Sequence, residues 1–97
     1  MKLEINKKSG VLSVAIDGRL DTVTAPELES ALANNYCDTT ELVIDCEKLI
    51  YISSAGLRVL LSAHKRMKGA MKLCKVGEVV MEVLEMTGFA DIWEIVR

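Results

Sequence analysis

Apolar and polar residues alternate along the first part of the chain, and this pattern predicts two β-strands. The alternation occurs over residues 2–6 and again over residues 11–17. Residues 7–10, Lys-Lys-Ser-Gly, lie between the two segments and are typical of a hairpin turn. We therefore predict that the chain opens with two antiparallel strands.

Three later segments carry apolar residues three and four positions apart, which predicts amphipathic helices. The first spans residues 24–35, where Thr24 can cap the helix and Glu27 stands at the capping-box position. The second spans residues 54–69 and the third residues 77–88, and each ends at a glycine.

Short apolar runs between these helices predict the remaining strands. Residues 42–44, Leu-Val-Ile, have the continuous apolar character of a central strand covered on both faces. Residues 70–76 and 92–96 predict two further strands, whereas the apolar stretch 49–52 leads into the second helix. The predicted order is β-β-α-β-α-β-α-β. Because alternating strands and helices favour parallel pairing, this order predicts an α/β fold with helices packed on a mixed sheet of about five strands.

The same pattern predicts which side chains form the core. We expect the third helix to bury Val79, Val80, Val83 and Leu84 and to expose Glu78, Glu82 and Glu85. Across the chain, the residues expected to be largely buried are Leu12, Val14, Ile16, Val43, Ile44, Leu57, Leu60, Leu61, Val80 and Leu84.

The composition fits one small domain and narrows the classes of function. Hydrophobic residues make up 51% of the 97 residues, enough for a single core. The formal net charge of −2 argues against direct binding of nucleic acid, which requires a basic surface. The opening Met-Lys-Leu-Glu does not resemble a signal peptide, and no apolar run is long enough to cross a membrane. We therefore expect a cytoplasmic protein without membrane insertion.

The three cysteines, Cys37, Cys46 and Cys74, are widely spaced and form no Cys-x-x-Cys pair. With His64 as the only histidine, neither a metal site nor a disulfide framework is expected. We expect buried thiols in a reducing compartment, and no cofactor.

Two serines at the predicted start of the second helix mark the candidate site. In open α/β sheets, sites gather beyond the carboxyl ends of strands, and Ser53 and Ser54 occupy such a place. One of these hydroxyls can simply cap the helix. Capping does not explain Gly56, because glycine in a helix costs about 0.5–1 kcal/mol relative to alanine. Its presence indicates close approach by a partner or by another segment.

Catalysis by these serines has no support in their surroundings. The Gly-x-Ser-x-Gly motif is absent. His64 lies roughly 15 Å along the same helix from Ser54, which is too far for proton transfer. We interpret His64 as a packed or boundary residue, and we expect neither catalytic residues nor enzymatic activity.

Two motifs carry a resemblance to a known family. Residues 45–57 read Asp-x-x-x-Leu-x-Tyr-Ile-Ser-Ser-Ala-Gly-Leu, and residues 18–21, Gly-Arg-Leu-Asp, are followed by Thr-Ala-Pro-Glu-Leu at 24–28. Both resemble segments of the anti-sigma factor antagonists (anti-anti-sigma factors) of the STAS family, and the first is the more specific. The element order matches along essentially the whole chain, so the resemblance implies a single STAS domain over residues 1–97.

The resemblance also implies roles for individual residues. Ser54 falls on the family's phosphorylated serine, and Asp21 falls on the loop acid that flanks it. Ser53 replaces an aspartate common in relatives and becomes a rival acceptor, and Ala55 stands where many relatives have Ser or Thr. The residues expected at the partner-binding surface are Asp21, Thr22, Ser53, Ser54, Ala55, Gly56 and Arg58.

Membership of this family implies a partner-switching cycle. The unphosphorylated protein binds an anti-sigma factor that is also a serine protein kinase, so that sigma factor is released for transcription. The kinase then phosphorylates Ser54 and loses affinity, and a PP2C-type phosphatase removes the phosphate. A second interpretation keeps the fold without the switch: an STAS adaptor module docked on a transporter or lipid-transport complex.

Overall fold

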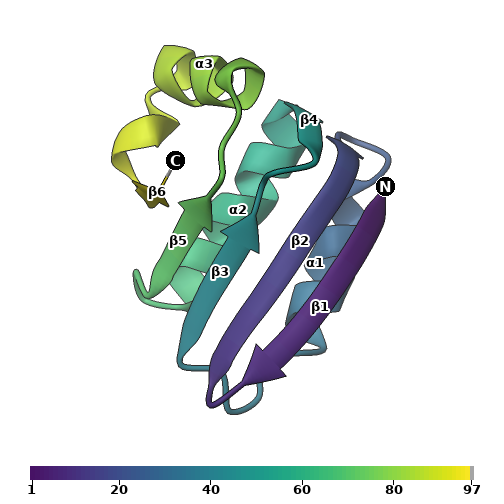
Figure 1. Ribbon diagram of the computed structural model, residues 1–97, viewed down its shortest axis with the longest axis vertical. Helices are drawn as coiled ribbons and strands as arrows, with labels where there is room; N and C mark the ends of the chain where they lie inside the picture. The colour runs from purple at the N-terminus through teal and green to yellow at the C-terminus, as the bar shows by residue number, and fades with distance from the viewer. Residues whose placement is uncertain (97) are drawn as a thin grey trace.

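Helices cover one face of a six-stranded sheet in the computed structural model, which describes residues 1–96 (Figure 1). The strands are β1 (Lys2–Lys8), β2 (Val11–Leu20), β3 (Glu41–Asp45), β4 (Leu49–Ile52), β5 (Met71–Cys74) and β6 (Glu94–Val96). The helices are α1 (Ala25–Ala33), α2 (Ser54–Arg66) and α3 (Glu78–Thr87), with a short 3-10 helix at Phe89–Asp91. Within the described residues, no helix is long and apolar enough to span a bilayer.

The sheet is mixed, as the sequence predicts. Its order is β1-β2-β3-β5-β6, and β4 pairs with β2. β1 is antiparallel to β2, whereas the β2–β3, β3–β5, β5–β6 and β2–β4 pairs are parallel. Ser9 and Gly10 form the hairpin turn with φ angles of 52° and 82°, and two residues of positive φ match the right-handed twist of the strands. The predicted α/β class and opening hairpin are confirmed.

The predicted order lacks one strand, because residues 49–52 form β4 rather than leading directly into α2. The length of β2 explains the extra strand. β2 has ten residues, but β3 pairs only with its residues 11–15 and β1 reaches only to Asp17. Beyond an irregularity at Gly18, β4 pairs with the last residues of β2 and satisfies backbone groups that are otherwise without partners.

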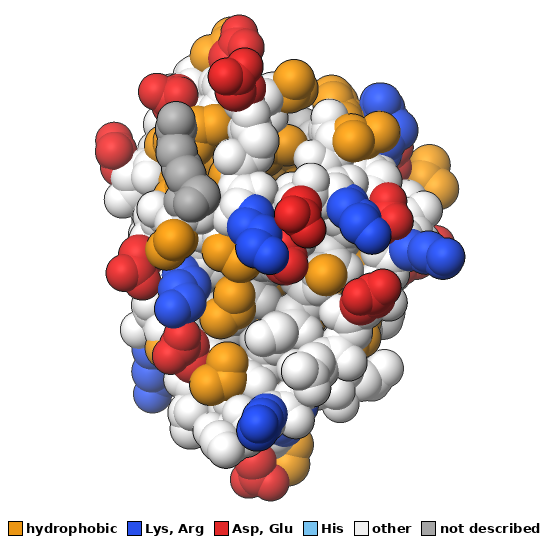
Figure 2. Space-filling model, viewed as in Figure 1, with side chains coloured by type: hydrophobic (Ala, Val, Ile, Leu, Met, Phe, Trp, Pro, Cys, Tyr) orange, Lys and Arg blue, Asp and Glu red, His pale blue; other side chains and the backbone are white. Residues whose placement is uncertain are grey.

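The face of the sheet opposite α1 and α2 is open to solvent. The register places Ser13, Val43 and Lys72 in one row across this face, and all three are partly exposed. Figure 2, viewed from this side, shows charged side chains of both signs scattered over it. The prediction that β3 is covered on both faces is therefore wrong, and with it the burial of Val43. The reason is that α1 and α2 lie on the same side of the sheet, while α3 lies beyond the ends of the strands (Figure 1).

The core otherwise follows the prediction. Eight of the ten expected residues are buried: Leu12, Val14, Ile16, Ile44, Leu57, Leu60, Val80 and Leu84. Leu61 is only half-buried, because it lies at the margin of the surface that α2 turns to the sheet. In α3, Val83 is half-buried and Val79 is 61% exposed, since the helix buries only Val80 and Leu84.

The cysteines differ in exposure, so the expectation of buried thiols holds only for Cys46. Cys37 is exposed in the loop after α1, and Cys74 is partly exposed on the open face. Burial raises the pKa of Cys46 to about 12 and also raises the pKa of Cys74. Among residues 1–96, no group of three or more His, Cys, Asp or Glu residues is placed to hold a metal ion.

The burial difference between adjacent leucines of α2 can be tested. Leu60→Ala is expected to lower the free energy of unfolding by about 2–5 kcal/mol, because Leu60 is 1% exposed. Leu61→Ala is the matched control and is expected to cost clearly less. Urea unfolding followed by circular dichroism measures both. Equal losses in the two variants would show that the helix has a different register.

The thiols are expected to differ in reactivity, because the thiolate is the reacting form. With iodoacetamide at about pH 8, Cys37 should be alkylated first in the native protein. Cys46 should stay protected, since a pKa of about 12 leaves roughly one thiolate in ten thousand molecules at that pH. Peptide mass spectrometry before and after unfolding in urea gives the order. Alkylation of Cys46 as fast as Cys37 would contradict the structure.

Candidate functional site

The candidate site lies where β2 and β4 end side by side. These strands are parallel, and Leu20 of β2 is in register with Ile52 of β4. The pairing continues one residue further, because the backbone N–H of Ser53 donates to the carbonyl of Leu20 at 2.9 Å. Asp21 and Ser53 therefore leave neighbouring strands at the same edge of the sheet, although they are far apart in the sequence.

Ser54 is the first residue of α2 and is exposed, while Ser53 is the N-cap residue with extended backbone. Neither hydroxyl is engaged in capping: α2 has no side-chain cap hydrogen bond, and the Ser53 Oγ is buried without a partner in the described chain. The first turn also has no acidic residue. The N-terminus of α2 thus keeps its free N–H groups and the positive end of the helix dipole, which favour an anion.

Asp21 organises the loop that follows β2. Its Oδ1 accepts hydrogen bonds from the backbone N–H groups of Val23 at 3.0 Å and Thr24 at 3.1 Å. The Thr24 backbone N–H is the main cause that lowers the pKa of Asp21, with smaller contributions from Val23 and from Arg19. The carboxylate is therefore ionised at neutral pH and fixed in direction.

Thr24 holds this loop rather than capping α1. Its hydroxyl donates to the Arg19 carbonyl at 2.8 Å and accepts from the Asp21 backbone N–H at 2.8 Å. No side-chain cap hydrogen bond forms at the start of α1, so the predicted capping box of Thr24 and Glu27 is wrong. The hydroxyl is committed to the loop, where it joins the end of β2 to the start of the helix.

A shallow hollow of about 370 Å³ between α1 and α2 brings together three residues expected at the partner-binding surface, Thr22, Ala55 and Arg58. Pro26, Glu29 and Val59 also line it. Arg58 is exposed and lies four residues after Ser54, so the two share one side of α2. Residues implied separately by the two sequence motifs thus form one continuous surface.

Comparison with known proteins decides the family. The family model of the STAS domain matches residues 2–97. The chain belongs to the STAS domain family. BtrV of Bordetella bronchiseptica, provisionally named an anti-sigma factor antagonist, is 38% identical over 98% of this chain and 85% of its own. The anti-sigma F factor antagonist of Paenibacillus polymyxa is 28% identical over 98% of this chain and 86% of its own.

A solved structure has the same fold as this STAS domain. The crystal structure of an anti-sigma factor antagonist from Mycobacterium paratuberculosis matches with a TM-score of 0.87 at 24% identity. The match covers 98% of this chain and 84% of that one. The family and fold predicted from the two motifs are confirmed.

Gly56 has a packing role in this STAS domain. It is buried, and a Cβ built on it would lie 2.7 Å from Leu20 Cγ and 3.0 Å from Ile52 Cγ1. The close approach indicated by the sequence is therefore made by another segment of the chain. The structure separates Gly56 from the other residues expected to bind a partner, because it places this residue inside the domain.

Sequence reasoning did not single out Arg19 and Tyr51 as site residues. The Arg19 guanidinium lies 4.3 Å from the centre of the Tyr51 ring, and its Nε is 3.9 Å from Asp21 Oδ2. A cation over an aromatic ring is attracted to the π face. Arg19 thereby links β4 to the Asp21 loop. The signal for this contact is the parallel register of β2 and β4, which places Arg19 opposite Tyr51.

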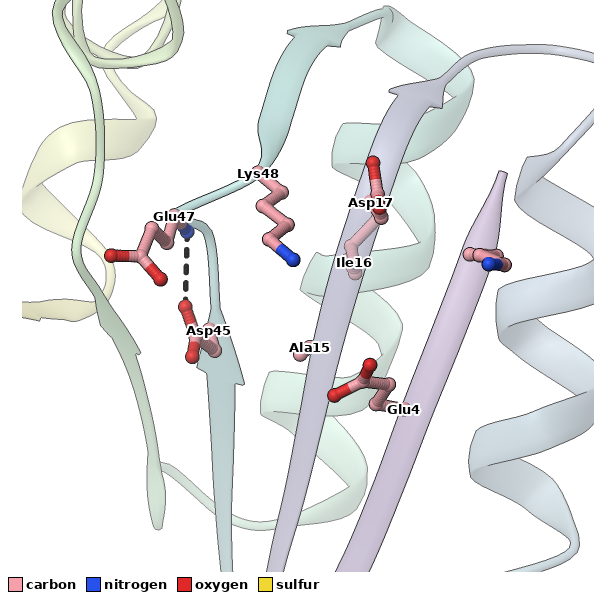
Figure 3. A pocket seen from close by; sticks show the side chains of 8 residues that line it. Glu4, Ala15, Ile16, Asp17, Asp45, Glu47 and Lys48 are labelled. Carbon is pink, nitrogen blue, oxygen red and sulfur yellow. Dashed lines mark hydrogen bonds between the residues drawn. The ribbon is translucent and has the colours of Figure 1, made fainter.

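His64 and a pocket on the open sheet face are two further features outside this site. His64 is half-buried on α2, as expected, with its Nδ1 buried and unpartnered within residues 1–96. The pocket on the open face has a volume of about 190 Å³. Figure 3 shows that Glu4, Asp17, Asp45 and Glu47 lie there with lysines, on the sheet face opposite α2. The Glu47 backbone N–H donates to Asp45 Oδ1 at 3.0 Å.

The contact of Gly56 with Leu20 predicts that Gly56→Ala destabilises the domain. Alanine improves helix propensity by about 0.5–1 kcal/mol, but overpacking costs typically about 1–3 kcal/mol. Leu20 and Ile52 are 0% and 2% exposed, so neither can move aside cheaply. Ala55→Ser, which adds one atom at the neighbouring, partly exposed position, is the control and should change stability by less than about 0.5 kcal/mol. Thermal unfolding that ranks Gly56→Ala at or above wild type would disprove this packing role.

Proposed function

We propose that this protein is an anti-sigma factor antagonist controlled by phosphorylation of Ser54. Its unphosphorylated form binds an anti-sigma factor that is also a serine kinase, and sigma factor is released for transcription. The observation that carries the proposal is the exposed Ser54 at the first turn of α2, with its hydroxyl free of capping. The names of the relatives from Bordetella bronchiseptica and Paenibacillus polymyxa support the antagonist role over that of a non-switching adaptor.

Accessibility favours Ser54 over Ser53 as the acceptor. A kinase must bring the hydroxyl oxygen in line with the γ-phosphate of ATP, so the oxygen must be reachable. Ser54 is exposed, whereas the Ser53 Oγ is buried. Phosphorylation of Ser53 therefore requires local opening of the junction between β4 and α2, and phosphorylation of Ser54 does not.

A phosphate on Ser54 is compatible with the folded domain. It adds a charge of about −1.5 to −2 at pH 7 at a helix N-terminus, where free N–H groups and the dipole stabilise an anion. Arg58, four residues on, supplies a positive charge on the same side of α2. The modification is therefore expected to act on the interface with the partner and to leave the fold intact.

The same charge opposes binding of a partner that fits the unmodified surface. The dianion must lose its hydration when a partner closes over it, and the ionised Asp21 lies in the neighbouring loop. A hundredfold loss of affinity requires only about 2.7 kcal/mol. Desolvation of a buried charge reaches that size, so one phosphate suffices to release the kinase. A PP2C-type phosphatase then restores the binding form.

The proposal is tested by incubating the wild-type protein, Ser54→Ala and Ser53→Ala with the cognate anti-sigma factor kinase and ATP. Mass spectrometry should place one phosphate on Ser54 in the wild type and in Ser53→Ala, and none in Ser54→Ala. Ser54→Ala should remain folded and keep kinase affinity after ATP is added, because it cannot be switched off. Ser54→Asp should weaken binding less than phosphate does, since it supplies one charge and fewer oxygens.

Circular dichroism of each variant separates a loss of binding from a loss of folding. Phosphate that persists in Ser54→Ala and vanishes in Ser53→Ala would move the acceptor to Ser53 while preserving the switch. If neither serine is phosphorylated by a kinase that binds the protein, and both alanine variants bind as wild type, the switch is refuted and the adaptor role takes its place.

A further inference from the structure

The helix α3 exposes two large apolar side chains, one of which, Val79, the sequence pattern assigns to the core. Val79 is 61% exposed and Met86 is 79% exposed, whereas Val80 and Leu84 of the same helix are buried. Val79 and Met86 are seven residues apart and so lie on the same side of the helix, with the half-buried Val83 beside them. Large apolar side chains gathered on one exposed surface are typical of a contact for another molecule.

The strand that packs against α3 also exposes an apolar side chain. β4 packs against α3, and Ile50 of β4 is 61% exposed. We call the side chains of Ile50, Val79, Val83 and Met86 the α3 surface. The two elements that carry these side chains pack against each other, so the fold fixes their relative position.

The segment of the chain that contains α3 carries acidic residues and no basic one. Residues 76–96 contain five acidic residues and neither lysine nor arginine; the acidic residues are Glu78, Glu82, Glu85, Asp91 and Glu94. At 100° per residue, Glu78, Glu82 and Glu85 form a stripe along α3 next to the apolar stripe, and all three are exposed. Red and orange side chains accordingly occur together at the top left of Figure 2, where Figure 1 places α3.

We propose that the α3 surface is a docking site for a basic amphipathic segment of a partner protein, separate from the Ser54 site. Apolar side chains of the segment pack on Val79 and Met86, and its lysines or arginines face the glutamate stripe. Charge complementarity selects this occupant. A second copy of this chain would bring one glutamate stripe against another in a two-fold contact, and the anionic surface of a membrane would repel the stripe. The contact needs no phosphate on Ser54, so it stands or falls independently of the proposed switch.

Two synthetic peptides test the proposal with the 97-residue protein. One carries leucines at helical spacing with lysines between them, and the other has the same composition in scrambled order. Isothermal titration calorimetry should show at least about tenfold tighter binding of the amphipathic peptide, since only it can present both stripes together. Amide NMR shifts should concentrate in α3 and β4. Added salt should weaken binding, because the ion pairs are exposed.

Variants locate the contact. Val79→Ser/Met86→Ser should weaken binding of the amphipathic peptide about tenfold, and Glu82→Lys should weaken it severalfold. Glu4→Lys/Ile5→Ser makes matched changes on β1, at positions that are likewise exposed, and should bind as wild type. Ser54→Ala should also bind as wild type. All of these substitutions are at exposed positions, and circular dichroism confirms that each variant is folded.

Several outcomes would overturn the proposal. Equal affinity for the scrambled peptide would mean that acidic charge alone attracts it. Unchanged binding in the α3 variants, or NMR shifts confined to the open sheet face, would place the contact elsewhere. Self-association in analytical ultracentrifugation that Met86→Lys abolishes would identify a second copy of the chain as the occupant. Absence of binding at low salt would remove the docking site altogether.

Discussion

The side chains of Leu20 and Ile52 fill the space beneath the first turn of α2, and this contact sets the geometry of the whole edge of the sheet. A Cβ on Gly56 would meet Leu20 Cγ at 2.7 Å, so glycine allows the helix to approach the strands more closely than any other residue does. The parallel pairing of β4 with the end of β2 aligns those two side chains. Ser54 begins α2 directly above the contact, and the Asp21 loop begins one residue after Leu20. The positions of Ser54 and of the Asp21 loop therefore both depend on the close contact of Gly56 with Leu20.

The hydroxyls at this edge of the sheet have two different roles: that of Thr24 holds the loop together, and that of Ser54 remains accessible. Thr24 gives its hydroxyl to the Arg19 carbonyl, and Asp21 accepts backbone N–H groups of the same loop, so this side is held by its own hydrogen bonds. The Ser54 hydroxyl makes no capping hydrogen bond. Ser54 is exposed at the N-terminus of α2, whose first turn has no acidic residue. The Asp21 loop is thus held by its own hydrogen bonds, whereas the Ser54 hydroxyl is left accessible for the modification that we propose.

The position of the helices explains where this STAS domain has surface to offer. Because α1 and α2 lie on one side of the sheet, its opposite face remains exposed to solvent. That face carries charged side chains of both signs, which are well hydrated. α3 lies beyond the strand ends and buries only Val80 and Leu84. A helix that is anchored on one narrow side exposes the remainder, and in α3 that remainder includes Val79 and Met86 beside a glutamate stripe. This placement of α3 explains why its apolar side chains are exposed next to its glutamates.

The sequence by itself determined the three helices and five of the six strands that the structure describes, and it marked Ser53 and Ser54 as the candidate site, because side-chain periodicity and local motifs are properties of neighbours along the chain. The alternation of Leu12, Val14 and Ile16 and the Ser53-Ser54 helix start are of this kind. Only the tertiary structure decided which apolar residues are covered, since Val43 and Val79 have core-like patterns but no element lies over them. It also decided that Thr24 serves the Asp21 loop, that residues 49–52 pair with β2, and that Gly56 meets Leu20. Each of these depends on contacts between segments distant in sequence, and periodicity carries no information about where those segments meet.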